Sequence, residues 1–316
     1  MDKTAVLLMA YGTPGSPEEI EPYYTDIRGG RKPTPENLRE LVGRYERIGR
    51  KTPLLEITRE QARALQATLG DGYKVYIGMK HWHPYLAEAV EEIARDGLHR
   101  VIAVALAPHY SSFSIDGYIQ RVTDAIQKSG APLQVTFVRS WNVHPLFLSA
   151  VAEKMEAQRK EFGVSWDEIN VVFSAHSLPV RILASNDPYP QELKETCEGV
   201  AARLGLEHWK FAYQSAGRTG EKWLGPEILE TLDEIARTNG CNNSAEGEAK
   251  RGANCHVLIA PIGFVADHLE VLYDIDVECA ERARSAGLEM RRIESPNAGP
   301  QFIAALAAIV RENMSM

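Results

Sequence analysis

The chain has 316 residues, of which 44% are hydrophobic and 25% are charged, an ordinary composition for globular proteins. Its net charge of −8 argues against a nucleic-acid partner, which would need a basic surface. No stretch approaches the roughly 20 apolar residues of a membrane span, and the run Ala5–Ala10 is too short for a signal peptide. We therefore expect a cytoplasmic protein with no membrane span.

Short β-branched runs alternate with helix-length segments along the whole chain. The expected strands are Ala5–Ala10, Lys74–Gly78, Val101–Ala107, Gln134–Val138, Asn170–Ser174, Lys210–Tyr213 and His256–Ala260. The expected helices include Leu86–Arg95, Leu146–Glu161, Gln191–Leu204, Pro226–Arg237 and Gln301–Asn313. Continuous apolar strands that alternate with helices predict an α/β fold with parallel sheets covered on both faces.

The length suits two domains of about 150 residues each. We place the first domain at residues 1–150 and the second at residues 151–316, and we allow the last helix to pack back on the first domain. The sequence contains neither a G-x-G-x-x-G motif after a strand nor a Walker A motif. These absences argue against the binding of dinucleotides and of nucleoside triphosphates.

Four expected strands end in a similar way, because an apolar run leads into Gly, Pro, His or Ser. The segments are VLLMAYGTP, VALAPHYSS, VVFSAHSLP and VLIAPIGFV. Functional groups of open α/β sheets gather at the carboxyl ends of strands. The third segment puts His176 at such an end, where an imidazole can accept a proton or bind a metal ion. The alternative interpretation is a hydrogen-bonded histidine that caps the turn.

An acidic pattern lies within the apolar segment GFVADHLEVLYDIDVEC, residues 263–279. Glu270, Asp274 and Glu278 follow one another at steps of four, and like charges at this spacing repel unless a cation or proton lies among them. On a regular α-helix such steps drift by about 40° each. A π-type turn would alter the drift and could aim the three carboxylates along one channel. A solvated acidic stripe is the alternative.

A basic and hydroxyl-rich group occupies the chain between Ile27 and Pro53. Its members are Arg28, Arg31, Lys32, Arg44, Tyr45, Arg47 and Thr52. Arginine suits carboxylate binding because its donors form a planar fork, although ordinary surface arginines would give the same pattern. Tyr11 offers a hydroxyl at the end of the first strand, and we interpret His81 and His83 as loop residues at a cleft rim.

The cysteines Cys197, Cys241, Cys255 and Cys279 include no C-x-x-C pair. We expect free thiols and no iron–sulfur or zinc site, because no two of them have ligand spacing. The segment Arg237–Cys255 is polar, Gly-rich and aperiodic. We interpret it as a mobile loop without function.

Six motifs spread over nearly the whole chain resemble those of ferrochelatases, in particular the soluble bacterial coproporphyrin ferrochelatases. They are MAYGTP, APHYSSFS, SAHSLP, DPYP, WLGP and GFVADHLEVLYD. The resemblance implies the chelatase fold, with two Rossmann-like domains and a porphyrin cleft between them. It also implies insertion of ferrous iron into coproporphyrin III, which gives coproheme in haem biosynthesis. A protoporphyrin IX ferrochelatase, a sirohydrochlorin-type chelatase and a non-catalytic porphyrin or haem carrier are the alternatives.

The same resemblance assigns roles to residues. His176 and Glu270 match the catalytic pair, in which His176 would accept a proton or bind the metal ion and Glu270 would share that work. Asp274 and Glu278 match an acidic line for metal ions on a helix with π character, and Tyr11 matches the residue that faces the metal ion across the ring. The matched porphyrin contacts are Tyr11, Thr13, Arg28, Arg44, Tyr45, Thr52, Ser114 and Tyr118. We expect no cofactor beyond the Fe²⁺ substrate, a monomer, and transient contact with a haem-forming decarboxylase.

Overall fold

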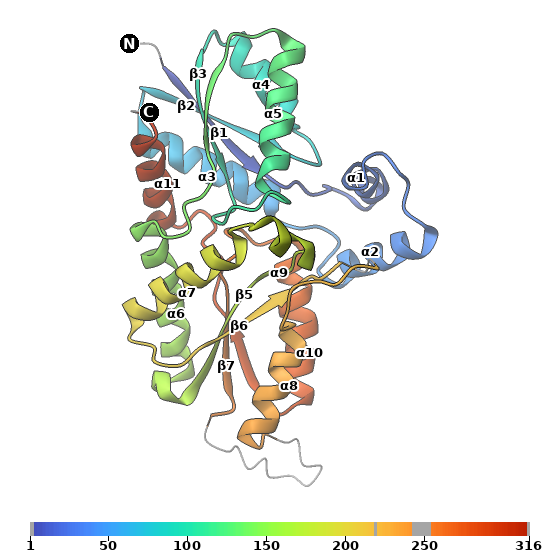
Figure 1. The fold of residues 1–316 in the computed structure, drawn as a ribbon, viewed down its shortest axis with the longest axis vertical. Helices are drawn as coiled ribbons and strands as arrows, with labels where there is room; N and C mark the ends of the chain where they lie inside the picture. The colour runs from blue at the N-terminus through green and yellow to red at the C-terminus, as the bar shows by residue number, and fades with distance from the viewer. Residues whose placement is uncertain (1–2, 218–219, 242–253, 315–316) are drawn as a thin grey trace. The chain divides into compact units, whose positions relative to one another are not determined.

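The computed structural model describes residues 3–217, 220–241 and 254–314, and Figure 1 shows its helices and strands. Two compact units make up the chain. The first unit comprises Met1–Leu146, Val265–Leu269 and Asn297–Met316, and the second comprises Phe147–Phe264 and Glu270–Pro296. Within the described ranges, no helix combines the length and the apolar character that crossing a membrane requires.

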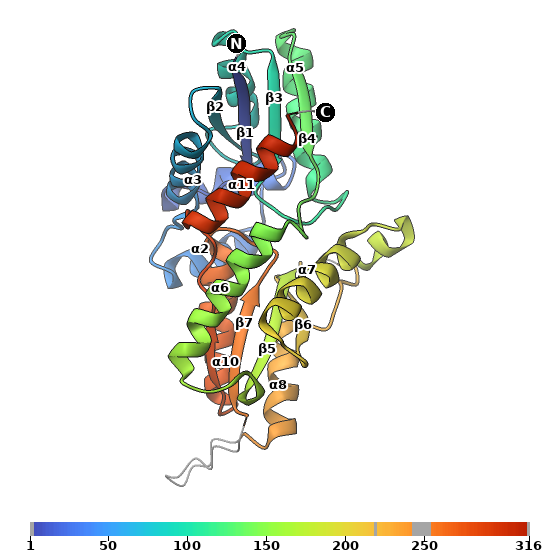
Figure 2. The ribbon, with the colours of Figure 1, turned by 90° about the vertical axis from the view of Figure 1, so that its left-hand side faces the viewer.

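The first unit is built on a four-stranded parallel sheet with the order β2-β1-β3-β4. Its strands are β1 (Thr4–Ala10), β2 (Tyr73–Met79), β3 (Arg100–Ala105) and β4 (Gln134–Val138). Its helices are η1 (Pro17–Glu19), α1 (Ile20–Ile27), α2 (Pro35–Arg47), α3 (Leu54–Leu69), α4 (Leu86–Arg95), α5 (Ile115–Ser129) and α11 (Pro300–Glu312). Figure 2 shows α3 and α11 together on one face of this sheet, with α4 and α5 on the other.

Strand β1 is one of the two inner strands of the first sheet, and all seven of its residues are buried. Successive side chains of a strand point to opposite faces of its sheet. Ala5, Leu7 and Met9 pack into the core beneath α4 and α5, so Val6 and Leu8 are left for the face that α3 and α11 cover. A continuous apolar strand is therefore the expected signature of a sheet covered on both sides.

The second unit repeats this plan with the strand order β6-β5-β7-β8, again parallel. Its strands are β5 (Ile169–His176), β6 (Lys210–Gln214), β7 (His256–Pro261) and β8 (Glu289–Arg292). Its helices are α6 (Pro145–Phe162), η2 (Trp166–Glu168), η3 (Val180–Ser185), α7 (Tyr189–Leu204), α8 (Ile228–Asn239), the π-helix η4 (Asp274–Cys279) and α10 (Ala280–Ser285). The chain passes from the first unit to the second within α9 (Leu269–Leu272).

Side chains of α8, η4 and α10 form one core of the second unit with alternate residues of β7, such as Val257 and Ile259. Helices α6 and α7 lie on the opposite face of the sheet (Figure 1). They approach each other closely at Gly199, where an added Cβ would lie 2.7 Å from Cδ1 of Leu148. The predicted parallel sheets flanked by helices are thus confirmed in both units. Strand β8 was not predicted, because its four residues, EMRR, are only half-buried and mostly charged.

A disulfide joins Cys241, just after α8, to Cys255, just before β7, and their Cα atoms are 5.9 Å apart. The prediction that all four cysteines are free thiols is therefore wrong for this pair, whereas Cys197 and Cys279 are free and buried. The spacing of the cysteines along the chain did not predict the bond, because the fold brings the end of α8 close to the start of β7. The bond closes the segment predicted as a mobile loop, of which residues 242–253 lie outside the described residues.

Gly78 of β2 provides a test of how tightly α4 packs on the first sheet. A Cβ at this position would lie 3.0 Å from Cα of Leu86 and 3.3 Å from Cβ of Ala89, and the backbone atom cannot move aside. Gly78→Ala should therefore lower the free energy of unfolding by about 1–3 kcal/mol. Urea unfolding followed by circular dichroism measures the change. Gly72→Ala is the matched control, because no atom lies within 4 Å of its added Cβ. Equal stability of the two variants would contradict the prediction.

Candidate active site

His176 is the last residue of β5 and lies beside Gln214, the last residue of β6. The backbone is held on both sides of this position. The Ser177 amide donates to the Gln214 carbonyl over 2.7 Å, and the Tyr189 hydroxyl donates to the His176 carbonyl over 2.9 Å. His176 therefore projects from a fixed point on the carboxyl edge of the second sheet, where open α/β folds bind their ligands.

Each ring nitrogen of His176 lies beside an oxygen acceptor, and these acceptors determine which nitrogen carries a proton. Nδ1 donates to the carbonyl of Ser177, and Nε2 lies 3.4 Å from Oε1 of Glu270. A carbonyl oxygen only accepts, so Nδ1 carries a proton and Nε2 is the nitrogen available for chemistry. The two side chains are about one-third exposed, 31% for His176 and 33% for Glu270. The structure thus brings the predicted catalytic pair together within the second unit.

Opposing effects set the pKa of His176. Removal from bulk water lowers the pKa, but the charge and hydrogen bonding of Glu270, the Ser177 carbonyl and the charge of Asp274 together raise it to about 9. The ring is therefore an imidazolium at neutral pH, with both nitrogens protonated. It can accept a proton or bind a metal ion only after Nε2 has released its proton.

Gln214 is a buried residue of the site that the sequence analysis missed. Its side chain accepts a hydrogen bond from Oγ of Ser174 over 2.9 Å and donates to the Glu270 carbonyl over 3.0 Å. Gln214 and Ser174 are both fully buried, so these bonds are shielded from water. Gln214 therefore connects β5 to the helix that carries Glu270 and holds the predicted catalytic pair at its spacing.

The predicted π-type turn is present, because η4 spans Asp274–Cys279. The Glu278 amide donates to the Tyr273 carbonyl over 3.0 Å, which is the i to i+5 bond of a π-turn. Asp274 is buried and accepts a hydrogen bond from Oγ of Ser215. Asp276, in contrast, pairs with Arg292 at 2.7 Å. Within the π-turn, Asp274 belongs to the predicted acidic line, whereas its neighbour Asp276 is held by a structural ion pair with Arg292.

A further acid, Glu227, lies near enough to Glu278 for their charges to interact. It caps α8 by accepting from the amides of Leu229 and Glu230. Burial and the negative charges of Glu230 and Glu278 raise the pKa of Glu227, against the effect of its two backbone hydrogen bonds. No local pattern predicts this acid, because its interaction with Glu278 depends on packing between α8 and η4. The negative potential around Glu278 is thus stronger than the predicted line alone would produce.

In the described part of the chain, no three side chains of the His, Cys, Asp and Glu types lie close enough together to hold a metal ion. The pair His176 and Glu270 offers two donors. A metal ion at this pair would therefore keep other ligands, such as water or a bound substrate. This open coordination suits a metal ion that is delivered and passed on more than one that is retained.

The predicted porphyrin contacts all belong to the first unit. Tyr11 follows β1 directly, is 41% exposed, and packs on the ring of His81 with centroids 4.6 Å apart. Thr13, Tyr45 and Thr52 form a buried hydroxyl cluster, in which the Thr13 and Thr52 oxygens are 2.7 Å apart and those of Thr13 and Tyr45 3.4 Å apart. The structure therefore brings three of the predicted residues together from separate segments.

The remaining predicted contacts lie at helix ends and faces of the first unit. Arg28 follows α1 and lies over the ring of Tyr24, with 5.7 Å from Cζ to the ring centroid. Arg44 pairs with Glu40 over 3.1 Å along α2. Ser114 directly precedes α5, and Tyr118 is buried on that helix.

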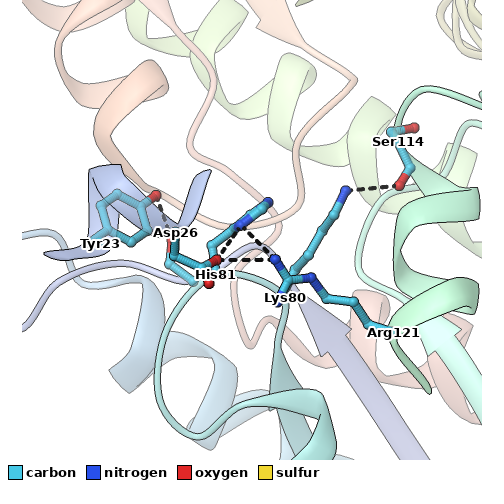
Figure 3. Close-up of polar contacts among 7 residues, drawn as sticks. Tyr23, Asp26, Lys80, His81, Ser114 and Arg121 are labelled. Carbon is cyan, nitrogen blue, oxygen red and sulfur yellow. Dashed lines mark hydrogen bonds and ion pairs between the residues drawn. The ribbon is translucent and has the colours of Figure 1, made fainter. Parts of the chain in front are cut away.

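A polar cluster of the first unit was missed because its members come from three distant segments (Figure 3). His81 donates through Nδ1 to Oδ2 of Asp26 over 2.7 Å, and Arg121 donates to the same oxygen over 3.1 Å. His81 lies in the loop between β2 and α4, as predicted, but its expected place at a rim is wrong, since only 7% of it is exposed. Burial and the nearby cations lower the pKa of His81 to about 4, despite its bond to Asp26, so this ring is neutral.

Comparison with known sequences gives a consistent result over the full length. The family model described as Ferrochelatase matches residues 3–314. A protein named Ferrochelatase from Herpetosiphon aurantiacus is 45% identical, and the alignment covers 98% of each chain. A protein named Coproporphyrin III ferrochelatase from Halalkalibacterium halodurans is 40% identical, covering 99% of this chain and 98% of that one.

Solved structures give the same fold at much lower identity. SirB from Bacillus subtilis with Fe³⁺ superimposes with a TM-score of 0.63 at 11% identity, covering 98% of this chain and 95% of that one. The sirohydrochlorin chelatase SirB from Bacillus subtilis subspecies spizizenii, in complex with cobalt, superimposes with a TM-score of 0.59 at 10% identity. The superposition covers 99% of this chain and 96% of that one. At this identity the likeness shows the fold alone.

The raised pKa of His176 makes a testable prediction. A pKa above the ordinary value of 6.5 means that the folded chain holds this proton more tightly than the unfolded chain. The pair therefore stabilises the fold fully below about pH 6.5 and loses this contribution as the pH rises to about 9. Nitrogen NMR of the ring should show a midpoint near 9.

Glu270→Gln removes the main cause of the increase and should lower this midpoint by more than about one unit. Asp276→Asn is the matched control, because Asp276 pairs with Arg292 and should not affect His176. A wild-type midpoint near 6.5 would show that the two side chains do not form a charged pair.

Proposed function

The chain belongs to the ferrochelatase family, and from this premise we propose that it inserts ferrous iron into coproporphyrin III. Insertion of a metal ion into a porphyrin is the reaction of the family, which matches residues 3–314. The observation that carries the proposal is the charged pair His176 and Glu270 at the carboxyl edge of the second sheet, followed by buried Asp274. We assign the catalytic roles to this pair.

The pair explains how protons could leave the porphyrin. Insertion requires two pyrrole protons to depart, and His176 is already protonated at neutral pH. A divalent cation that approaches the pair repels the imidazolium proton and lowers its pKa. Nε2 then releases its proton toward Glu270, 3.4 Å away, and gains the lone pair that accepts a pyrrole proton.

This sequence of events separates two roles that one nitrogen cannot hold at once. Nδ1 is occupied by the Ser177 carbonyl, so Nε2 is the only ring nitrogen that can act. We propose that Nε2 of His176 acts as the proton acceptor, and that Glu270 shares both the proton and the incoming metal ion. Tyr11 would face the metal ion from the other side of the ring.

The acids of the π-turn would conduct hydrated cations toward the pair. Asp274 contributes to the electrostatics of His176, and Glu278 contributes to those of Glu227, so negative charge extends from the pair outward. Carboxylates that lie close together repel one another unless a cation binds between them. We therefore propose that Glu278 receives Fe²⁺ and that Asp274 passes it toward Glu270.

The preference for coproporphyrin III rests on the relatives and on charge. The Halalkalibacterium relative is named for this substrate, whereas the Herpetosiphon relative is named only as a ferrochelatase. Arg28 and Arg44 lie in a charged stretch of the first unit, which suits a substrate rich in carboxylates. The hydroxyl cluster of Thr13, Tyr45 and Thr52, with Ser114 and Tyr118, would complete the porphyrin contacts.

Of the alternatives, a protoporphyrin IX ferrochelatase differs only in substrate. A sirohydrochlorin-type chelatase shares the fold, but the family match argues for a porphyrin. A carrier would need a cationic clamp and an axial ligand but no acidic line. We further propose that the enzyme is a cytoplasmic monomer that needs no cofactor beyond its Fe²⁺ substrate. Its product would pass to a haem-forming decarboxylase.

Insertion assays with two porphyrins test the proposal directly. Under anaerobic conditions, the loss of free-porphyrin fluorescence is followed with Fe²⁺ and either coproporphyrin III or protoporphyrin IX. We expect kcat/KM to be at least about tenfold higher for coproporphyrin III, because charged hydrogen bonds to additional carboxylates favour it. Faster turnover of protoporphyrin IX would show that the substrate assignment is wrong. Tight binding of both porphyrins without turnover would favour the non-catalytic carrier.

Glu278→Gln tests the acidic path without touching the catalytic pair. The change removes one negative charge from the outer part of the line and should raise the KM for Fe²⁺ several-fold while kcat changes by less than about twofold. Glu207→Gln is the control, because Glu207 is an exposed acid elsewhere in the same unit. An unchanged dependence of the rate on Fe²⁺ concentration would count against the path.

A further inference from the structure

Lys80 is a half-buried cation at the carboxyl end of β2. Its amide donates to the Ala10 carbonyl over 2.8 Å, which holds it beside the end of β1. Its ammonium donates to the Ser114 carbonyl over 3.3 Å and lies 4.9 Å from the centroid of the Tyr118 ring. Figure 3 shows this side chain extended toward Ser114, on the side away from Asp26. Lys80 therefore reaches between two of the predicted porphyrin contacts.

The charges around Lys80 do not balance. In the described part of the chain, no carboxylate lies within ion-pair distance of its ammonium. The nearby Asp26 carboxylate is shared by Arg121 and His81, and His81 is neutral. The Asp26 carboxylate is thus balanced by Arg121, and the positive charge of Lys80 is left without a carboxylate partner in the described part of the chain. Burial and the Arg121 charge lower the pKa of Lys80 to about 8, so the ammonium is still mostly protonated at pH 7.

Helix α5 is shaped to accept this ammonium. Gly117 lies in the first turn of α5, and a Cβ there would approach Nζ of Lys80 to 2.5 Å and Cε to 2.8 Å. A glycine inside a helix is unfavourable relative to alanine, so its presence here is explained by the room that it leaves for the lysine. Lys80 has three N–H donors, and the Ser114 carbonyl uses one of them.

We propose that Lys80 binds a carboxylate of the porphyrin substrate and thereby selects porphyrins that carry more than two carboxylates. This inference rests on the proposed function, because it presupposes a porphyrin bound near Ser114 and Tyr118. Coproporphyrin III has four propionates, whereas protoporphyrin IX has vinyl groups in place of two of them. A vinyl group would leave the ammonium desolvated without a partner, and an unpaired charge is costly. Lys80 thus both favours the tetracarboxylate and disfavours the dicarboxylate.

Binding measurements with Lys80→Met test the inference without requiring any metal insertion. Methionine keeps much of the length and apolar surface of lysine but removes the charge. Porphyrin affinity is measured by fluorescence titration with coproporphyrin III and with deuteroporphyrin IX, which has two propionates. The substitution should weaken binding of coproporphyrin III by about tenfold, while the affinity for deuteroporphyrin IX changes by less than about twofold or improves.

Two further variants separate a binding role from a structural one. Lys80→Arg keeps the positive charge and should restore most of the preference for coproporphyrin III. Lys128→Met removes an exposed lysine from the last turn of α5 and should leave both affinities unchanged. If Lys80→Met lost affinity equally for both porphyrins, or lost affinity for neither, the inference would be overturned. Absence of iron insertion by the wild type would instead overturn the proposed function, since binding is measured independently.

Gly117→Ala gives an independent test from the opposite side of the contact. The added methyl group would displace the lysine ammonium, whose side chain is flexible enough to move away. The ratio of the two affinities should therefore shift in the same direction as in Lys80→Met, by about threefold or more. An unchanged ratio in this variant would show that the position of the ammonium does not matter for selection.

Discussion

The ion pair of His176 and Glu270 is the interaction on which the chemistry of the second unit depends. It joins the end of β5 to the helix that begins at the unit boundary, and fully buried Gln214 holds both parts in register. Because each partner stabilises the charged form of the other, the site rests in a state that is protonated and closed to metal ions. In the proposed mechanism, the arrival of a cation changes this state and couples proton release to metal delivery through electrostatics.

The π-helix has a physical role in this arrangement. A regular α-helix would turn successive acids of the Glu270, Asp274 and Glu278 series progressively away from one another. The i to i+5 turn at Tyr273 changes that rotation within the part that follows Glu270. π-turns are less stable than α-helical turns and persist where function requires them. Packing of Ile275 and Cys279 into the core of the unit offsets the cost, since both are fully buried.

The sequence was sufficient for features that have a periodic or local signal. Continuous apolar runs predicted the parallel strands, and the spacing of acids pointed to the segment that forms the π-turn. It could not reveal features that depend on packing between distant segments. Gln214, Lys80 and the disulfide of Cys241 and Cys255 each acquire their partners only when the fold brings separate segments of the chain together. His81 was misread because its burial comes from Asp26 and Arg121, which no local pattern connects to it.

The two units carry opposite kinds of charge at the residues to which we assign roles, and the proposed function accounts for this difference. The second unit places Glu270 and Asp274 near His176, an arrangement that under the proposed function attracts a metal cation and accepts protons. The first unit leaves the positive charge of Lys80 uncompensated among hydroxyl and aromatic groups, which attracts carboxylates. Under the proposed function, the cations of the first unit attract the propionates of the macrocycle, whereas the acids of the second unit attract the metal ion. Selection of the macrocycle and handling of the metal ion can therefore vary independently within one fold.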